Sequence, residues 1–272
     1  MKTYKRTLTI AGSDSGGGAG IQADLKTFSA LGCFGMSVLT AITAQNTVAV
    51  TAIHPIPIDV IGAQIDAVLN DLGADAIKIG MLHSPEVIAV VAERLAHHGV
   101  KNIVLDPVMV AKSGDKLLLD DAVDALKAEL LPMATVITPN LPEASVFLGR
   151  SLEGRQTDGQ MEEACRDLAG MGAQAVLLKG GHAEGEVSRD LLYITADQAF
   201  HAFEAKRIDT PNLHGTGCTL SSAIAALLAQ GLEIKAAVAE AKRYISDAIV
   251  AGAEYTIGQG HGPVHHFYRS WS

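Results

Sequence analysis

The sequence predicts an α/β fold in which a mostly parallel sheet carries helices on both of its faces. Short apolar runs alternate with amphipathic helical stretches along all 272 residues, and the runs are apolar throughout, as strands covered on both faces are. Hydrophobic residues make up 48% of the chain and aromatic residues only 4%, which favours this class over an aromatic-rich β-sandwich. The expected strands are 7–11, 37–44, 76–81, 102–106, 136–139 and Ala175–Lys179.

The expected helices follow from apolar residues that recur at helical spacing between these strands. The clearest stripes are Ile61, Ile65, Val68, Leu69 and Leu72; Val87, Val90, Val91 and Leu95; and Met161, Ala164, Cys165 and Leu168. Two segments break the alternation: residues 47–58 predict an extended flap, and residues 190–208 predict an antiparallel hairpin at the sheet edge. No linker, fixed-period repeat or low-complexity segment is visible, so we expect a single domain over residues 1–272.

Composition and charge exclude several classes of partner. A formal net charge of −9 argues against a nucleic-acid surface, which needs a basic patch. The three cysteines are odd in number and far apart, which argues against a disulfide framework and favours a reducing compartment. The first apolar run is too short for a signal or membrane segment. We therefore expect a cytoplasmic protein that binds neither membrane nor nucleic acid.

Polar residues follow most of the predicted strands directly. Because ligands of open parallel sheets bind beyond the carboxyl ends of the strands, we expect these residues to outline one cleft. They are Gly12-Ser13-Asp14, Gln45-Asn46, Met81, Asp106-Pro107, Asn140 and Lys179-Gly180-Gly181.

A glycine-rich turn near the far end of the chain predicts an anion site. The run Gly215-Thr216-Gly217-Cys218 comes just before a helical stripe of apolar residues, so its glycines lie at a helix N-terminus. Free N–H groups and the helix dipole attract anions there. The same position is expected to lower the pKa of the Cys218 thiol. Cys33 and Cys165 are expected to lie in the core.

Two further segments allow a structural and a functional interpretation. The glycine-rich run 12–20 fits neither G-x-G-x-x-G nor G-x-x-x-x-G-K-[ST], so it is either a tight strand-to-helix turn or a segment that closes over a small substrate. The histidines His261, His265 and His266 suggest a metal site, but no acidic residue or cysteine lies near them in sequence. We therefore expect a packed tail.

The strand-end charges also allow two interpretations each. Asn140 and Glu143 have the spacing of a capping box, yet both could also hold Mg²⁺ through its water shell. Lys179 ends a buried run, so it is either a plain surface lysine or, as we favour, a cation that neutralises a polyphosphate. Asp106, just before Pro107, suits a turn, a metal ligand or a general base.

Together these segments resemble the bacterial hydroxymethylpyrimidine/phosphomethylpyrimidine kinases of thiamine biosynthesis, in order and over nearly the whole length. The matching runs are GSDSGGGAGIQAD at 12–24, TAQN at 43–46, KIGM at 78–81, LDPVM at 105–109, TPNLPEA at 138–144, LKGGH at 178–182, HGTGCT at 214–219 and GHGP at 260–263. The resemblance implies a ribokinase-like three-layer α/β/α domain, commonly dimeric. It also implies that ATP and Mg²⁺ serve to phosphorylate 4-amino-5-hydroxymethyl-2-methylpyrimidine, and then its monophosphate.

The resemblance also implies a role for each matching residue. Gln45 would recognise the aminopyrimidine, because a carboxamide can accept from the amino N–H and donate to the ring nitrogen beside it. Lys179 would contact the ATP phosphates. The remaining assignments are a substrate pocket of Gly12, Asp24, Met81 and Val108; an Mg²⁺ site of Asp106, Asn140 and Glu143; and an anion hole of Gly215, Thr216 and Gly217.

Cys218 departs from the wider ribokinase group, which usually has an aspartate as general base at this position. The second acceptor is a phosphate monoester that is already largely ionised near pH 7, so it needs no base, and a carboxylate would repel it. A neutral thiol would accept both substrates. The hypothesis is therefore that Cys218 replaces a carboxylate unsuited to the second reaction.

Three other functions remain open at this point. A pyridoxal kinase of the same fold would phosphorylate an equivalent hydroxymethyl group, but pyridoxal lacks the exocyclic amine that Gln45 suits. A dinucleotide-dependent oxidoreductase would need a phosphate fingerprint that the first glycine-rich run lacks. A non-catalytic ligand-binding module would not need Lys179, Glu143 and the complete anion turn.

Overall fold

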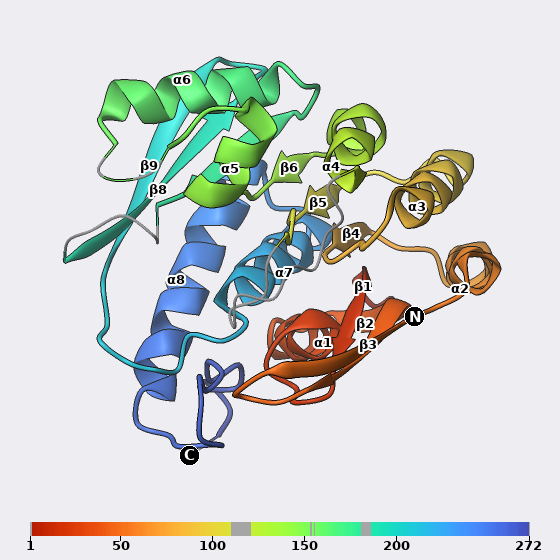
Figure 1. The fold of residues 1–272 in the computed structure, drawn as a ribbon, viewed down its shortest axis with the longest axis horizontal. Coiled ribbons are helices and arrows are strands. Elements are labelled where there is room, and N and C mark those ends of the chain that lie inside the picture. The colour runs from red at the N-terminus through yellow and green to blue at the C-terminus, as the bar shows by residue number, and fades with distance from the viewer. Residues whose placement is uncertain (1, 110–120, 153, 155, 181–185, 272) are drawn as a thin grey trace.

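The computed structural model describes residues 2–109, 121–152, 154, 156–180 and 186–271. In these residues one nine-stranded sheet has the order β3-β2-β1-β4-β5-β6-β7-β8-β9 (Figure 1). The strands are β1 (Arg6–Asp14), β2 (Phe34–Gln45), β3 (Val50–Pro55), β4 (Ala76–Ile79), β5 (Ile103–Leu105), β6 (Val136–Ile137), β7 (Ala175–Lys179), β8 (Val187–Ile194) and β9 (Ala199–Lys206).

The centre of the sheet is parallel and its two ends are antiparallel. Strands β2, β1, β4, β5, β6 and β7 pair in parallel. At one end β3 runs antiparallel to β2, and at the other the β8–β9 hairpin continues antiparallel from β7. These results confirm the mostly parallel sheet, the extended segment within 47–58 and the edge hairpin expected at 190–208, which begins earlier, at Val187. The flap is shorter than expected, because Ile58 already begins a helix.

Helices cover both faces of this sheet. They are α1 (Gly20–Ala30), α2 (Ile58–Asp71), α3 (Pro85–His97), α4 (Ala122–Ala125), α5 (Leu141–Leu148), α6 (Asp158–Ala169), α7 (Thr216–Ala229) and α8 (Ile234–Gly252), with a π-helical turn Leu126–Leu130 and a 3₁₀ turn Leu131–Met133. Helices α1, α7 and α8 lie on one face and α2 to α6 on the other (Figure 1). The expected three-layer α/β/α sandwich is therefore confirmed.

The central strands are mostly apolar because helices cover both faces of the sheet. Side chains alternate between the two faces of a strand, and both faces here are buried. In β5, Val104 packs into the core beneath α1, α7 and α8, while Ile103 and Leu105 pack into the core beneath α2 to α6. In β7, Leu177 packs beneath α1, α7 and α8, and Leu178 packs beneath α2 to α6. A polar residue on either face would lose its hydration, so the central strands are mostly apolar, and a buried charge such as Lys78 of β4 needs a partner.

Several helices begin where the sequence supplies a cap. Ser84 accepts a hydrogen bond from the Val87 N–H, and Pro85 occupies the first turn of α3. Thr157 and Gln160 form a capping box at the start of α6. These caps satisfy N–H groups that have no partner inside the helix. No helix among the described residues is both long and apolar enough to cross a membrane.

One buried ion pair joins four elements of the fold. Lys78 of β4 and Asp24 of α1 have no exposed surface, and the Lys78 Nζ lies 2.9 Å from the Asp24 carboxylate. The same carboxylate accepts hydrogen bonds from Thr9 of β1 at 2.6 Å and from Ser222 of α7 at 2.6 Å. Asp24 therefore connects β1, α1 and α7 to Lys78. Among the described hydrogen-bond partners of Asp24, Lys78 is the one with a positive charge.

Removing this carboxylate is expected to destabilise the fold strongly. Asp24→Asn leaves the Lys78 ammonium buried without its counter-charge, which typically costs about 3–5 kcal/mol. The free energy of unfolding in urea measures the loss. The matched control is Asp66→Asn, which removes a half-exposed carboxylate paired with Arg94 and His98 and is expected to cost far less. Equal losses in the two variants would contradict the interpretation.

Candidate active site

The strand-end residues meet at one large cavity. The cavity has a volume of about 710 Å³ and lies at the carboxyl edge of the parallel strands, where the sequence places it. Its lining includes Gly12, Ser13, Asp14, Gln45, Met81, Asp106, Val108, Asn140, Glu143, Lys179, Gly215, Thr216, Gly217 and Cys218. Asn46 is instead used in a turn, where its side chain accepts N–H bonds from Val48 and Ala49. Gly181 and His182 lie outside the described residues.

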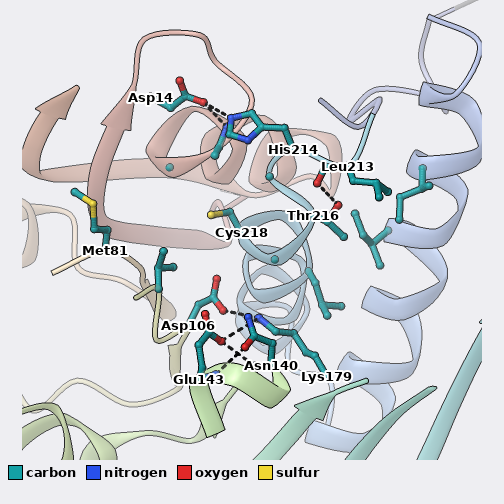
Figure 2. Close-up of a pocket in the computed structure, with 18 of the residues that line it drawn as sticks. Asp14, Met81, Asp106, Asn140, Glu143, Lys179, Leu213, His214, Thr216 and Cys218 are labelled. Carbon is teal, nitrogen blue, oxygen red and sulfur yellow. Dashed lines mark hydrogen bonds and ion pairs between the residues drawn. The ribbon is translucent and has the colours of Figure 1, made fainter. Parts of the chain in front are cut away.

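The anion turn forms the N-terminus of α7, as predicted. Gly215 is the N-cap residue at φ 77°, a conformation that favours glycine. A Cβ there would lie only 1.8 Å from the Gly18 carbonyl oxygen, so a larger residue has no room. The Thr216 hydroxyl donates to the Leu213 carbonyl at 2.7 Å and closes the turn (Figure 2). The Thr216 N–H makes only a long bond of 3.3 Å to the same carbonyl. The first N–H groups of a helix have no partner within it, so those of α7 can bind an anion.

Cys218 does not have the lowered pKa that its position suggests. Burial raises the pKa of the thiol to about 11, and Asp24 and Asp106 add to the effect, while Lys78 opposes it. Burial therefore outweighs the helix dipole. The expected lowering of this pKa is not found, and a neutral thiol is the form that the hypothesis for Cys218 requires. The other two cysteines, Cys33 and Cys165, are buried in the core as expected.

Lys179 lies among acidic side chains at the end of β7. Its Nζ is 2.9 Å from the Asp106 carboxylate and 4.0 Å from that of Glu143. Burial works to lower the pKa of Lys179, but Asp106 and Glu143 raise it above its ordinary value. A Cβ on Gly217 would lie 3.5 Å from the Lys179 Nζ. The ammonium therefore remains charged and directly faces the anion turn (Figure 2).

Asn140 and Glu143 form the predicted capping box and also line the cavity. The Asn140 side chain accepts from the Glu143 N–H at 2.8 Å, and the Glu143 carboxylate accepts from the Asn140 N–H at 2.8 Å. Burial raises the pKa of Glu143 to about 7, although Lys179 opposes the rise. The structural role is thus confirmed, and the oxygen that accepts from the Asn140 N–H is also the one that lies 4.0 Å from the Lys179 Nζ.

The same acidic end offers oxygen ligands of the kind that Mg²⁺ prefers. Asp106 is a carboxylate: burial works to raise its pKa, but Lys179 and Lys78 hold that pKa below its ordinary value. The residues described contain no group of three His, Cys, Asp or Glu side chains arranged around one point. The carboxylates of Asp106 and Glu143 are donors of the kind that Mg²⁺ takes when it keeps most of its water and phosphate ligands.

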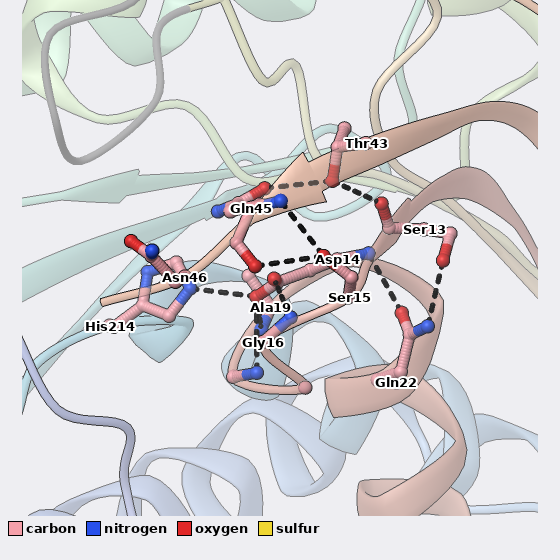
Figure 3. A network of polar contacts seen from close by, with 12 residues as sticks. Ser13, Asp14, Ser15, Gly16, Ala19, Gln22, Thr43, Gln45, Asn46 and His214 are labelled. Atoms are coloured by element: carbon pink, nitrogen blue, oxygen red, sulfur yellow. Dashed lines mark hydrogen bonds and ion pairs between the residues drawn. The ribbon is translucent and has the colours of Figure 1, made fainter. Parts of the chain in front are cut away.

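The opposite end of the cavity contains Gln45. Its backbone N–H donates to the Ser15 hydroxyl, which in turn donates to the Gln45 carbonyl, both at 2.8 Å. Its side-chain oxygen lies 3.2 Å from the Thr43 hydroxyl (Figure 3). Nearby, Gly12 and Met81 touch so closely that a Cβ on the glycine would lie 2.5 Å from the Met81 methyl group. Gly12, Met81 and the Gln45 side chain line the same cavity.

Asp24 was placed wrongly in the substrate pocket. It has no exposed surface and lies behind the cavity wall, because its carboxylate is directed inward at Lys78, Thr9 and Ser222. Its role in this fold is to hold Lys78, which does reach the cavity lining. A lysine between Ile77 and Ile79 in a buried strand is the sequence signal for such a partner, since a buried charge needs one.

Sequence reasoning also missed two polar pairs that line the cavity. Asp14 and His214 are bonded to each other at 2.8 Å, although 200 residues separate them. On the far side, Lys242 of α8 pairs with Asp190 of β8 at 2.7 Å. No local motif marks either pair. Both arise only when distant elements pack together.

The histidine-rich C-terminal run is a packed segment. Val264 and His266 are buried, the Tyr244 hydroxyl donates to the His266 carbonyl at 2.7 Å, and the His266 ring contacts Thr219 of α7 at 3.1 Å. Burial lowers the pKa of His266 to about 3. The run therefore holds α7 and α8 together as expected.

An anion turn, a buried lysine and a carboxylate cluster at one end of a cavity define a phosphotransferase site. Comparison with known proteins agrees: the pattern of the phosphomethylpyrimidine kinase family matches residues 14–265, and the chain belongs to that family. A hydroxymethylpyrimidine/phosphomethylpyrimidine kinase of Rhizobium meliloti is 54% identical over 97% of both chains.

Solved structures show the same fold. A phosphomethylpyrimidine kinase of Clostridium difficile has a TM-score of 0.79 at 46% identity, covering 90% of this chain and 99% of that one. A Bacillus subtilis pyridoxal kinase, in an ADP complex, has a TM-score of 0.89 at 40% identity, covering 98% and 100%. The ribokinase-like fold is therefore common to relatives named for two different acceptors.

The raised pKa of Glu143 predicts a pH-dependent stability. Between its ordinary value of 4.5 and about 7, the folded protein keeps a proton that the unfolded chain has released. Stability therefore falls as pH rises through this window, by at most about 3 kcal/mol. Glu143→Gln preserves the cap but removes this slope, so its stability relative to wild type rises with pH.

Urea unfolding at intervals from pH 5 to 7.5 measures the difference between Glu143→Gln and wild type. The surface variant Glu162→Gln controls for the loss of one negative charge. A difference that stays constant with pH would show that Glu143 is ionised throughout.

Proposed function

We propose that the protein transfers the γ-phosphoryl group of ATP to 4-amino-5-hydroxymethyl-2-methylpyrimidine, and then a second one to the resulting monophosphate, in thiamine biosynthesis. The observation that carries this proposal is that Gln45, Lys179 and the Gly215–Cys218 turn all line one cavity. Family membership and the names of the curated relatives support the same substrates.

Gln45 recognises the acceptor ring in this proposal. A carboxamide accepts from the exocyclic amine and donates to the adjacent ring nitrogen, as it does with adenine. The Ser15 bonds hold the Gln45 backbone, so only the side chain needs to adjust. Gly12, Met81 and Val108 border the same space and enclose the flat ring.

Phosphoryl transfer takes place beside the anion turn. The acceptor oxygen bonds to the γ-phosphorus while the bond to the β,γ-bridging oxygen breaks, and ADP leaves with that electron pair. In the first reaction the hydroxyl proton of the acceptor passes to an oxygen of the transferred phosphoryl group, and in the second the acceptor phosphate is already ionised. The N–H groups of Gly215, Thr216 and Gly217 receive the charge that spreads over the transferring oxygens, and Lys179 neutralises the polyphosphate. Such a loose transition state depends mainly on positioning and charge.

Mg²⁺ is the expected ion, and Asp106, Asn140 and Glu143 are the residues that would hold it. When bound, it neutralises phosphate charge. Before that, Asp106 holds the Lys179 ammonium, and the Asn140–Glu143 box fixes the start of α5. The acidic end is therefore rigid before a nucleotide arrives.

The nucleotide base is proposed to lie where the cavity extends between the edge hairpin and the C-terminal helices. Leu213, Ile245 and Ile249 form an apolar wall there, opposite Ala205 and Ile208. Apolar contact suits an adenine ring and leaves no sequence motif. The ADP complex of the Bacillus subtilis relative supports nucleotide binding by this fold.

We also propose that residues 1–272 act as one cytoplasmic kinase domain that forms a homodimer. Strand β3 is the edge of the sheet, and its residues from Thr51 to Pro55 are exposed. Ile42, Val48 and Ile53 leave apolar surface in water beside that edge. A second copy that covered this edge would remove the exposed strand.

A pyridoxal kinase is the second candidate, favoured by the close structural likeness to that of Bacillus subtilis. Pyridoxal presents an equivalent hydroxymethyl group but no exocyclic amine. Gln45 would then lose one hydrogen bond. Side activity on pyridoxal fits the proposal, whereas a preference for it does not.

One assay separates these candidates. ADP release from MgATP is measured with the hydroxymethylpyrimidine, its monophosphate and pyridoxal as acceptors. We expect turnover with the first two at a kcat/KM at least about 10-fold above that for pyridoxal, since one unmatched polar contact costs at least this much. Gln45→Leu should lose this preference. Higher efficiency with pyridoxal supports the second candidate, and binding without turnover supports a non-catalytic module.

Replacement of Cys218 tests why the thiol is present. In Cys218→Asp, a fixed carboxylate faces the phosphate of the second acceptor, and like charges about 5 Å apart at an effective dielectric constant of about 20 repel by roughly 3 kcal/mol. We expect the second phosphorylation to fall about 10- to 100-fold more than the first. The control Cys218→Ser stays neutral and should keep the ratio of the two rates. An undiminished second phosphorylation in Cys218→Asp would refute the hypothesis.

A further inference from the structure

The carboxylate of Asp14 organises the glycine-rich loop that follows β1. It is buried, and its two oxygens accept N–H bonds from Gly16 at 2.8 Å, Gly18 at 3.1 Å and Ala19 at 2.8 Å. The His214 ring nitrogen Nε2 supplies a fourth bond at 2.8 Å (Figure 3). The three backbone bonds shape the loop, and the bond to His214 connects the loop to another part of the chain.

His214 belongs to the anion turn rather than to the loop. It immediately precedes Gly215, and its backbone N–H donates to the Gly262 carbonyl at 3.0 Å. Loop and turn also touch directly. A Cβ on Gly18 would lie 2.4 Å from the His214 ring, and one on Gly215 would lie 1.8 Å from the Gly18 carbonyl oxygen. The loop can therefore approach the turn this closely only through its glycines.

The other side of the loop is bonded to the acceptor end of the cavity. Ser15, next to Asp14, exchanges two hydrogen bonds of 2.8 Å with the Gln45 backbone. A continuous series of contacts thus runs from Gln45 through Ser15 and Asp14 to His214 and Gly215 (Figures 2 and 3). Its two ends are the groups that hold the acceptor and the transferring phosphoryl group in the proposed reaction.

The charge on Asp14 strengthens these bonds. Burial works to raise the pKa of Asp14, but the hydrogen bonds from His214 and Ala19 hold it below its ordinary value. Asp14 is therefore a carboxylate at neutral pH, and bonds to a carboxylate are shorter and stronger than neutral ones. Loss of the His214 donor would leave a buried oxygen with one partner fewer.

We propose that the Asp14–His214 pair acts as a clasp that sets the distance between the acceptor and the anion turn, and that His214 is a positioning residue. The proposal rests on the proposed function and gives a role to His214, which lies in the matching run 214–219 but had none. Phosphoryl transfer depends on alignment, and a displacement of about 1 Å can cost up to about 100-fold in rate. The clasp therefore acts on kcat more than on nucleotide binding.

Two substitutions of His214 separate its hydrogen bond from its bulk. In His214→Leu the donor is lost, and we expect kcat for both phosphorylations to fall about 10- to 100-fold, with KM for ATP changed less than about 3-fold. His214→Gln keeps a side-chain N–H at similar reach and is expected to retain kcat within about 5-fold of wild type. Rates are normalised to the folded fraction, measured by circular dichroism.

His98→Leu is the matched control. His98 pairs with Asp66 at 2.9 Å and its side chain is 11% exposed, against 2.8 Å and 12% for His214, but it lies at the α2–α3 surface, away from the cavity. His98→Leu removes the same type of contact as His214→Leu and is expected to leave kcat unchanged. An equal loss of kcat in both variants would show a general effect on folding and overturn the proposal.

Amide hydrogen exchange gives a readout that needs no activity. In His214→Leu, exchange in residues 16–19 should accelerate about 10-fold or more, while exchange in α2 stays as in wild type. If the wild-type protein shows no kinase turnover, the proposed function fails, yet exchange still decides whether the clasp orders the loop. Unchanged exchange at 16–19, or a kcat loss that His214→Gln shares in full, would overturn the proposal.

Discussion

Buried opposite charges beneath the cavity determine how the other parts of the site are arranged. Lys78 pairs with Asp24, and Lys179 pairs with Asp106, each at 2.9 Å. Helix α7 docks onto both carboxylates, because its Ser222 donates to Asp24 at 2.6 Å and its Ser221 lies 3.3 Å from Asp106. The anion turn begins this same helix. The place where a phosphoryl group would be held is therefore set by charges that cannot separate without leaving one another unpaired and buried.

The cavity has two ends that are built by different means. The acidic end consists of side chains that emerge from consecutive parallel strands, so neighbouring strands alone bring Asp106, Asn140 and Lys179 together. The acceptor end is made of backbone, because glycines let the loop after β1 approach the anion turn, and Asp14 binds its free N–H groups. Rigidity at both ends suits phosphoryl transfer, which depends on positions held before the substrates arrive. The neutral Cys218 lies between them (Figure 2).

Much of the site could be read from local sequence because a parallel sheet places the ends of its strands at one edge. Gln45 and Asn140 follow predicted strands, Asp106 and Lys179 end them, and all four line the cavity. The capping box of Asn140 and Glu143 was equally visible, since a cap depends on residues three positions apart. Asp24 shows the limit of a shared motif. Asp24 lies in a run that matches the family, but its side chain points into the core. Its partners Thr9, Lys78 and Ser222 reach it only because β1, β4 and α7 pack around α1.

The sequence by itself determined the alternation of strands and helices, the strand-end residues and the glycine-rich turns, because each depends on periodicity or on neighbours a few residues apart. Only the tertiary structure decided which distant groups meet and what charge they carry. Asp14 finds His214 across 200 residues, and the pKa of Cys218 rises to about 11 through burial although its helix position alone favours a lower value. The physical reason is that desolvation and ion pairing depend on what surrounds a group in space, and that is settled only when the layers pack.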